Sequence, residues 1–325
     1  MTSNNRLLAA VVFGIVLIAV SVAVIHFGLY GLTLFIALPV ALGALGSWVI
    51  RAQSAPTATA AGMTANAIAC LGFLAMGLEG ITCILMAMPL ALPLGALGGW
   101  LAYAATHKRA LAQATAMLMF LPLGLGTLGF DLTAKPHIFQ VRSSIEIAAP
   151  PEKVWNKVVS FSDLPRPSEW YFKTGLAYPM RARIEGQGPG AVRYCEFSTG
   201  PFVEPIQVWD EPRLLRFSVA QNPAPMTEWS PYAKVLPRHL HGYLISKQGQ
   251  FLLTPLPNGH TLLEGTTWYQ HGLWPEAYWT IWSQAVIHRI HMRVLVHIKN
   301  LSEAEGYAAR PSESGDRPGT ISRGN

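Results

Sequence analysis

The first 130 residues of this chain contain almost no charge. Four charged side chains lie between residues 7 and 130, where Ala, Leu, Gly, Val, Ile and Met dominate. There are three cysteines, two of them in apolar runs, so the sequence indicates neither a disulfide framework nor a cysteine metal site. It also contains no nucleophile elbow, phosphate loop, dinucleotide fingerprint or metal-binding signature. These absences exclude the enzyme classes that such motifs identify.

The net charge of +6 does not indicate a nucleic-acid partner. Five of the 24 Lys and Arg residues flank the apolar runs, and the other 19 are spread among 16 acidic residues in the C-terminal part. The local excess is therefore only +3, without the basic cluster that binding to phosphates requires.

The uncharged runs are long enough for about five transmembrane helices. One crossing takes roughly 20 apolar residues. The sequence therefore predicts an all-α transmembrane domain of residues 1–131, and Lys135-Pro136 ends the helical region. The predicted spans cover residues 7–26, 29–50, 64–83, 86–106 and 110–130.

An internal repeat joins the first two helical hairpins. Tyr30-Gly31-Leu32-Thr33 and the small residues after it match Glu79-Gly80-Ile81-Thr82 and its continuation. Small residues let helices approach closely in lipid, so we interpret the repeat as a packing motif. Glu79 corresponds to Tyr30 at a turn, so we expect a carboxylate at the water interface and not a proton relay; His26 and Asp131 are interpreted in the same way.

The basic residues predict the orientation. With five spans, Arg6, Arg51 and the cluster at residues 107–109 fall on one side, which should be cytoplasmic. The chain from residue 132 onward then lies on the periplasmic or extracytoplasmic side of an inner or plasma membrane. If the third and fourth spans are one segment, or the fifth lies in the interface, that part is cytoplasmic instead.

The C-terminal part shows the patterns of an α+β domain. Strands are predicted at residues 139–147, 180–186, 190–198, 203–210, 213–220, 242–254 and 260–270, and helices at 148–159 and 276–304. Pro257-Asn258-Gly259 marks a hairpin between the last two strands. Residues 306–325 are rich in Gly, Ser, Pro and charge, so we expect a disordered tail.

This order of elements, with the opening segment Ser144-Ile-Glu-Ile-Ala-Ala-Pro-Pro-Glu-Lys-Val-Trp155, resembles the SRPBCC superfamily of START, birch-pollen-allergen and polyketide cyclase or dehydrase domains. The resemblance covers residues 138–305. It implies a helix-grip fold, in which a curved antiparallel sheet surrounds a long C-terminal helix and leaves a cavity for lipids, sterols, isoprenoids or polyketides. It transfers no catalytic residues, because the superfamily shares none.

Aromatic and polar side chains of this domain supply the candidate ligand contacts. Large rings suit the wall of an apolar cavity, although they equally suit a core or a belt at the lipid headgroups. His297 is predicted on the helix face that closes the cavity, with Trp282 and Arg293 at its edge. The candidate ligand-binding residues are Trp170, Tyr194, Glu196, His241, Glu264, Trp268, Trp282, Arg293 and His297.

The histidines do not indicate a metal site. His288 and His291 lie about 160 and 100 degrees, respectively, from the centre of the face predicted to close the cavity, so we expect surface or interface positions. His239 and His241 have strand spacing and would share one face. Residues 221–240 are predicted to be irregular, as a lid, a loop touching the bilayer or a plain surface loop.

Three functions agree with these patterns. The first is a membrane-anchored protein that binds or transfers a hydrophobic small molecule, with membrane lipids as partners and no cofactor. The second is a cyclase or dehydratase acting on a membrane-derived apolar substrate, for which Tyr194, Glu196, His241, Glu264 and His297 could supply acid or base groups. The third is a structural subunit that docks onto a membrane-protein partner.

Overall fold

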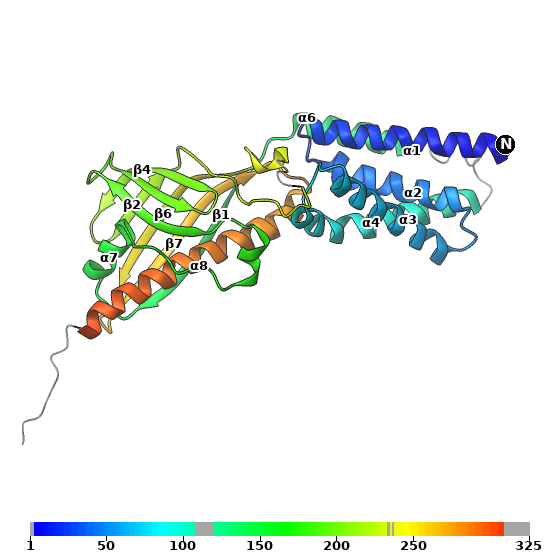
Figure 1. Cartoon of the computed structure of the whole chain (residues 1–325). Coiled ribbons are helices and arrows are strands. Elements are labelled where there is room, and N and C mark those ends of the chain that lie inside the picture. The colour runs from blue at the N-terminus through cyan, green and yellow to red at the C-terminus, as the bar shows by residue number, and fades with distance from the viewer. Residues whose placement is uncertain (1–2, 108–119, 233–234, 236, 309–325) are drawn as a thin grey trace, which may run out of the picture.

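The computed structural model describes residues 3–107, 120–232, 235 and 237–308, which form an N-terminal helical bundle and a C-terminal sheet domain (Figure 1). The bundle contains α1 (Ser3–His26), η1 (Thr33–Ala37), α2 (Leu38–Ile50), α3 (Ala55–Ala75), α4 (Ile81–His107) and α6 (Phe120–Thr133). Four segments are long and apolar enough to cross a membrane: Leu8–His26, Thr33–Ile50, Ala55–Ala75 and Ile81–Thr106. The fifth predicted span begins outside the described residues, and α6 covers its second half.

The start of α3 departs from the sequence prediction. The helix occupies residues 55–75, whereas the predicted span was 64–83. The Ser54 side chain accepts a hydrogen bond from the Thr57 backbone and Pro56 lies in the first turn, both of which favour a helix start there. Gly77, with φ of 66°, ends it. The prediction followed the most apolar stretch of the sequence and was wrong, because the capping residues set the boundaries of this helix.

Small residues bring α2, α3 and α4 into backbone contact. A Cβ atom on Gly98 would overlap the carbonyl oxygen of Val40, and one on Gly99 that of Ala58. A Cβ atom on Gly95 would lie 2.6 Å from the carbonyl oxygen of Gly62. These contacts confirm the packing interpretation of the repeat.

The C-terminal part is one curled antiparallel sheet with seven strands. The sheet order is β1-β7-β6-β5-β4-β3-β2, and the long helix α8 (Glu276–Ala308) packs against it (Figure 1). The strands are β1 (Ile138–Ile147), β2 (Pro179–Glu185), β3 (Val192–Phe197), β4 (Gly200–Asp210), β5 (Leu214–Ser218), β6 (Leu244–Pro255) and β7 (Thr261–His271).

Apolar residues of the sheet, α7 (Pro151–Val159) and α8 form one core, which includes Ile147, Trp155, Leu263 and Leu295. The predicted strands and terminal helix are confirmed to within a few residues. Between α7 and β2 the chain forms only the short 3-10 helix η2 (Trp170–Thr174). Of the predicted tail, the first residues belong to α8 and residues 309–325 lie outside the described part of the chain.

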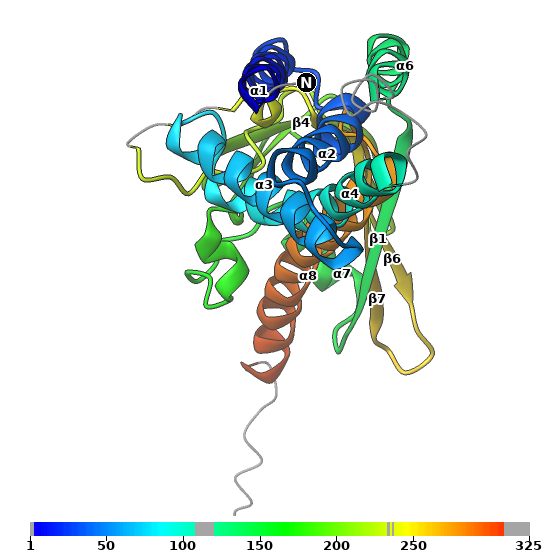
Figure 2. The same cartoon turned by 90° about the vertical axis from the view of Figure 1, so that its right-hand side faces the viewer.

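The sheet domain sits on one end of the bundle. The turns at residues 27–32 and 76–80 face it, whereas the C-terminal ends of α2 and α4 lie at the opposite end (Figure 1). Seen along the bundle, α1 and α6 lie on the same side of α2 (Figure 2). Asp131, at the end of α6, accepts hydrogen bonds from the backbone of Leu32 and Thr33, at 2.7 and 2.8 Å. The Asp131 carboxylate therefore holds the end of α6, where the chain leaves the bundle, against the turn between α1 and α2.

Candidate ligand site between the bundle and the sheet domain

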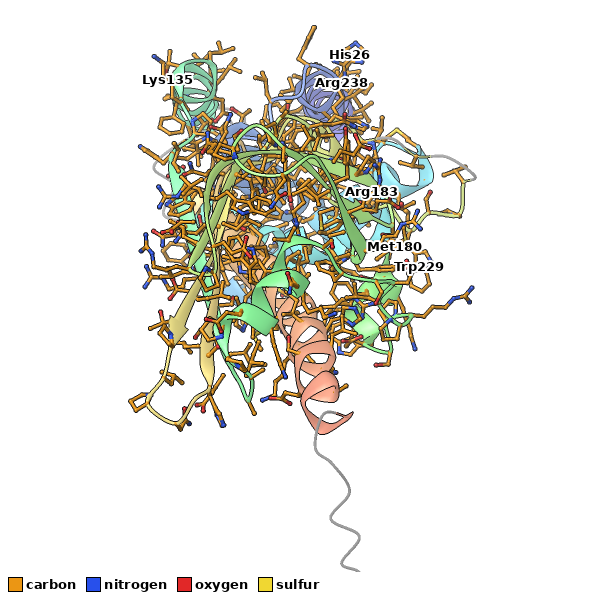
Figure 3. The ribbon with its side chains drawn as sticks, turned by 90° about the vertical axis from the view of Figure 1, so that its left-hand side faces the viewer. His26, Lys135, Met180, Arg183, Trp229 and Arg238 are labelled. Atoms are coloured by element: carbon orange, nitrogen blue, oxygen red, sulfur yellow. The ribbon has the colours of Figure 1, made fainter. Side chains whose placement is uncertain are left out.

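The contact between the bundle and the sheet domain, called the seam below, is built largely from hydrogen bonds to backbone groups. The Ile81 N–H donates to the Trp229 carbonyl at 2.7 Å, and the Trp274 N–H donates to the Tyr30 carbonyl at 3.0 Å. The Tyr243 hydroxyl also donates to a backbone carbonyl of the bundle. In Figure 3, His26 of the bundle and Arg238 of the sheet domain lie at one edge of the seam.

Residues 221–240, predicted to be irregular, supply much of the seam. Where described, this segment has no strand or α-helix and contains only the short 3-10 helix η3 (Arg238–Leu240). Met226, Glu228 and His239 from it reach Cys83 of α4. The segment therefore contacts the end of the bundle, where α3 ends and α4 begins.

An apolar cavity of about 170 Å³ lies in the seam. In other proteins an apolar cavity of about 150 Å³ binds benzene, so this volume is large enough for a ring-sized apolar group. Both parts of the protein form its wall, with Leu38, Phe73 and Ala87 from the bundle and Leu244 and Trp279 from the sheet domain. We call it the seam cavity.

A polar cluster forms part of the wall of the seam cavity. The Tyr30 hydroxyl donates to Glu79 Oε1 at 2.7 Å, and His239 Nδ1 lies 3.4 Å from Glu79 Oε2. His239 Nε2 lies 2.9 Å from Cys83 Sγ, which also contacts Glu228. We call Tyr30, Glu79, Cys83, Glu228 and His239 the seam cluster.

Burial shifts the titration of the seam cluster. It raises the pKa of Glu79 to about 8, against the opposing effect of the Tyr30 hydrogen bond. It lowers the pKa of His239 to about 4 and raises that of Glu228. Glu79 and His239 are therefore largely uncharged at neutral pH in the absence of a further ligand.

The structure corrects the interpretation of Glu79. We expected a carboxylate at the water interface, but Glu79 is only 8% exposed because the sheet domain covers the turn that carries it. Its hydrogen-bond partner Tyr30 is the equivalent residue of the first hairpin, so the repeat brings matching positions together. This pairing could not be predicted from the sequence, because the repeat shows that the two positions are equivalent and not that they are in contact.

A second cavity, of about 130 Å³, lies inside the sheet domain between the curled sheet and α8. We call it the grip cavity. Phe197, Phe217 and Phe251 from the sheet and Ile290 and Val294 from α8 contribute to its wall. Its position is the one that the helix-grip resemblance implies.

One ion pair is buried in the wall of the grip cavity. Arg193 and Glu204 are direct partners on β3 and β4, with side chains only 2% and 8% exposed. Burial raises the pKa of Glu204, and the adjacent guanidinium opposes this effect. Among the described residues, Arg193 Nε and Nη2 have no hydrogen-bond partner. The guanidinium thus has two donors available for a molecule in the cavity.

The two cavities are neighbours. Pro225, Leu244 and Val286 line both of them. Val286 belongs to α8 and Leu244 begins β6, so the dividing wall is formed by the sheet domain. A molecule held between the apolar helices of the bundle would therefore lie next to the interior of the sheet.

Most of the predicted contact residues lie elsewhere. Trp282 lines the seam cavity, whereas the other eight candidates line neither of these two cavities of the described structure. Trp170 is 74% exposed, His241 is exposed and Trp268 is half-buried on β7. The charged candidates make ion pairs: Glu196 with Arg181, Glu264 with Arg142, and Arg293 with Glu169. Tyr194 stacks under Arg183, and His297 approaches the Ser162 carbonyl at 3.2 Å.

Two histidine predictions change. His239 and His241 were expected on one face of a strand, but His239 is in η3 and buried while His241 is exposed. His291 was expected away from the cavity, yet it lines the grip cavity because α8 is rotated relative to the predicted face. Its Nε2 lies 2.7 Å from Thr267 Oγ1 and its Nδ1 lies 3.2 Å from Ser143 Oγ.

The inward position of Arg193 could have been recognised from the sequence. Alternation along residues 191–197 places Arg193 on the same face as the buried Ala191, Cys195 and Phe197. A basic residue on the inward face of a strand indicates a buried partner or a ligand. For Cys83, Glu228 and His239 the sequence offers no comparable signal, because their proximity depends on how the two parts dock.

Acid is expected to destabilise the protein through His291. Burial, together with the nearby His288, lowers the pKa of His291 from its ordinary 6.5 to about 4. Its contribution to stability is therefore complete above pH 6.5 and is lost as the pH falls toward 4, by roughly 1.4 kcal/mol per pH unit. His291→Gln should flatten the pH dependence of thermal unfolding between pH 6.5 and 4, whereas the exposed control His241→Gln should follow the wild type. Parallel curves for wild type and His291→Gln would contradict this assignment.

The comparisons with known proteins concern the sheet domain. Residues 139–259 match the family model described as polyketide cyclase / dehydrase and lipid transport. No curated protein matches the chain significantly.

Solved structures similar to the chain cover about half of it. A protein from Nitrosospira multiformis has 16% identity over 52% of this chain and 99% of its own, with a TM-score of 0.32. Norcoclaurine synthase from Thalictrum flavum, in complex with dopamine and hydroxybenzaldehyde, has 11% identity over 52% of this chain and 88% of its own, with a TM-score of 0.34. The protein XoxI from Bacillus cereus has 16% identity over 51% and 97%, with a TM-score of 0.34.

Proposed function

We propose, for a chain whose residues 139–259 match the polyketide cyclase, dehydrase and lipid transport family, that its sheet domain binds an apolar small molecule taken from the membrane. The helical bundle anchors the protein in the bilayer, and the molecule moves between the seam cavity and the grip cavity. The single observation that carries this proposal is the shared wall of the two cavities, formed by Pro225, Leu244 and Val286.

The arrangement suits a molecule that partitions into lipid. The bundle's share of the seam cavity comes from helices with the length and apolarity of membrane spans. Such a wall lets an apolar molecule leave the bilayer without crossing water, which avoids the large free-energy cost of hydrating its surface. Binding and transfer thus use the same apolar path.

The grip cavity favours a ligand with an oxygen acceptor. Arg193 Nε and Nη2 and the Thr266 hydroxyl line this cavity without a hydrogen-bond partner among the described residues, and most of the rest of the wall is apolar. A carboxylate, carbonyl or hydroxyl oxygen would satisfy these donors, whereas a pure hydrocarbon would leave them unpaired at a cost of about 1 to 3 kcal/mol. We therefore expect an apolar body with an oxygen function at one point.

We also propose that the sheet domain lies on the extracytoplasmic side. The C-terminal ends of α2 and α4 lie at the end of the bundle away from the sheet domain (Figure 1). Arg51 directly follows α2, and Lys108-Arg109 directly follow α4 in the sequence. Positive residues favour the cytoplasmic side of a membrane. A reporter enzyme that is active only outside the cytoplasm should be active when fused after residue 308, and inactivity there would reverse the assignment.

One observation favours an enzyme as the second candidate. Tyr30, Glu79 and His239 face one another in the wall of the seam cavity, an arrangement that can exchange protons with a bound molecule. A cyclase or dehydratase reaction would need at least two such groups, one to donate a proton and one to accept it. Conversion of a recovered ligand by wild type but not by Glu79→Gln, with binding retained, would support this candidate over simple transfer.

The test of the proposed function is recovery of the bound molecule. Full-length protein purified in a mild detergent should release a stoichiometric apolar compound containing oxygen, detected by native mass spectrometry and solvent extraction. Recovery of only bulk phospholipid, in the same proportion as from an unrelated membrane protein, would reject ligand binding. That result would instead favour a structural subunit.

A further inference from the structure

The seam cluster draws its side chains from both parts of the chain. Glu79 lies in the turn before α4 and Cys83 lies in its first turn, whereas Glu228 and His239 come from the segment between β5 and β6. In sequence the two pairs are about 150 residues apart, which is why spacing did not reveal them. The two pairs come together only because the sheet domain docks on the bundle.

Three of these side chains have the chemistry and spacing of metal ligands. One ligand atom each from Glu79, Cys83 and His239 lies within 4.8 Å of the other two. Metal–ligand bonds of about 2.0 to 2.3 Å at tetrahedral angles place ligand atoms roughly 3.3 to 3.7 Å apart. His239 Nε2 and Cys83 Sγ are 2.9 Å apart, so small side-chain adjustments would reach this geometry.

Unsatisfied buried atoms form the second observation. His239 Nδ1 and Glu228 Oε2 have no hydrogen-bond partner among the described residues. The Glu228 side chain is 0% exposed and that of His239 is 10% exposed. Buried polar groups normally have partners, because leaving one unpaired costs free energy. Hydrogen bonds within the cluster therefore do not account for all of its polar atoms.

We propose that Glu79, Cys83 and His239 bind a Zn²⁺ ion at the seam. A thiolate, an imidazole and a carboxylate are the ligand types that zinc prefers, and three protein ligands leave a fourth position for water or an oxygen of a cavity ligand. The Tyr30 hydroxyl donates to the Glu79 carboxylate and would keep it oriented. The Cys83 thiol donates to Glu228 in this structure, so Glu228 would take up the thiol proton when the thiolate binds the metal and would then donate a hydrogen bond to the sulfur. This inference does not depend on what occupies the cavities.

Charge balance supports a divalent cation. The Glu79 carboxylate and the Cys83 thiolate together carry two negative charges, which neutralise Zn²⁺ in a site with little access to water. His239 contributes a neutral nitrogen. Because two ligands belong to the bundle and one to the sheet domain, the ion would also fasten the two parts together.

The test uses the full-length protein in detergent. Incubation with ZnCl2 followed by gel filtration should leave roughly one zinc per chain by elemental analysis, as expected for a site with three protein ligands. After chelation and loading with Co²⁺, a thiolate-to-cobalt charge-transfer band should appear in the near ultraviolet. Cys83→Ser should lose the band, and His239→Gln should retain at most a tenth of the metal. Cys70→Ser, which changes another cysteine in the wall of the seam cavity, should bind like the wild type.

The outcomes are distinct. Absence of zinc and of the cobalt band in the wild type overturns the proposal without reference to any variant. Zinc that remains in Cys83→Ser, or a cobalt band that persists there, also overturns it. If Cys83→Ser does not fold, the wild-type cobalt spectrum decides alone. If the protein retains no zinc after incubation with ZnCl2 but still releases an apolar ligand, the metal site is rejected and the proposed function stands.

Discussion

Val286→Trp is expected to abolish retention of the apolar ligand. Val286 lines both cavities, so an indole at this position fills the wall between them and occupies space on both sides. We expect the amount of co-purified ligand to fall by at least about tenfold, equivalent to roughly 1.4 kcal/mol or more of binding free energy. Mass spectrometry of extracts from equal amounts of protein measures the change.

Val296→Trp is the matched control for this variant. It introduces the same side chain on the same helix, but Val296 is exposed and lines neither cavity of the described structure. Ligand content should therefore match that of the wild type. Equal ligand content in Val286→Trp and Val296→Trp, with both variants folded, would show that the shared wall is not on the binding path.

Arg193→Met is expected to destabilise the protein by about 3 to 5 kcal/mol, because it leaves the buried Glu204 carboxylate without its partner. The double variant Arg193→Met/Glu204→Leu should recover most of this loss, since replacing both members of a buried pair with apolar groups removes the uncompensated charge. Thermal or denaturant unfolding of the full-length protein, followed by tryptophan fluorescence, measures both effects. A double variant no more stable than Arg193→Met would contradict this explanation.

The exposed Arg183 provides the control for the buried pair. It also contacts acidic side chains, Glu185 and Glu196, but its side chain is half exposed at the outer side of the sheet (Figure 3). Arg183→Met should therefore leave the unfolding curve nearly unchanged.

The double variant at Arg193 and Glu204 also tests ligand recognition, because it should remain folded and yet lose ligands that carry an oxygen acceptor.

Local patterns determined the elements that the sequence predicted well. Alternation along β1 and the Pro257-Asn258-Gly259 turn between β6 and β7 are properties of neighbouring residues, so they could be read without the fold. The helix-grip resemblance then supplied the curvature of the sheet and the position of the grip cavity. By contrast, α3 was misplaced because its polar first turns were judged by hydropathy and not by the Ser54 cap.

The candidate site could not be predicted from local sequence patterns. Glu79 and His239 are surrounded in the sequence by turn residues, and each taken alone is most simply interpreted as a surface group. They are buried because the sheet domain docks on the turn between α3 and α4, and no periodicity encodes that docking. The nine predicted contact residues came from the faces of single elements, and of these Trp282 alone lines one of the two cavities of the described structure.

Photocrosslinking tests the central claim most directly. A diazirine-bearing fatty acid, incorporated into vesicles with the full-length protein and activated by light, should label peptides on both sides of the seam. We expect modification of α2 or α3 near Leu38 and Phe73, and of β6 or α8 near Leu244 and Val286, with the α8 label reduced in Val286→Trp. Labelling confined to the lipid-facing helices, unchanged in Val286→Trp, would contradict the proposal that an apolar molecule passes from the bundle into the sheet domain.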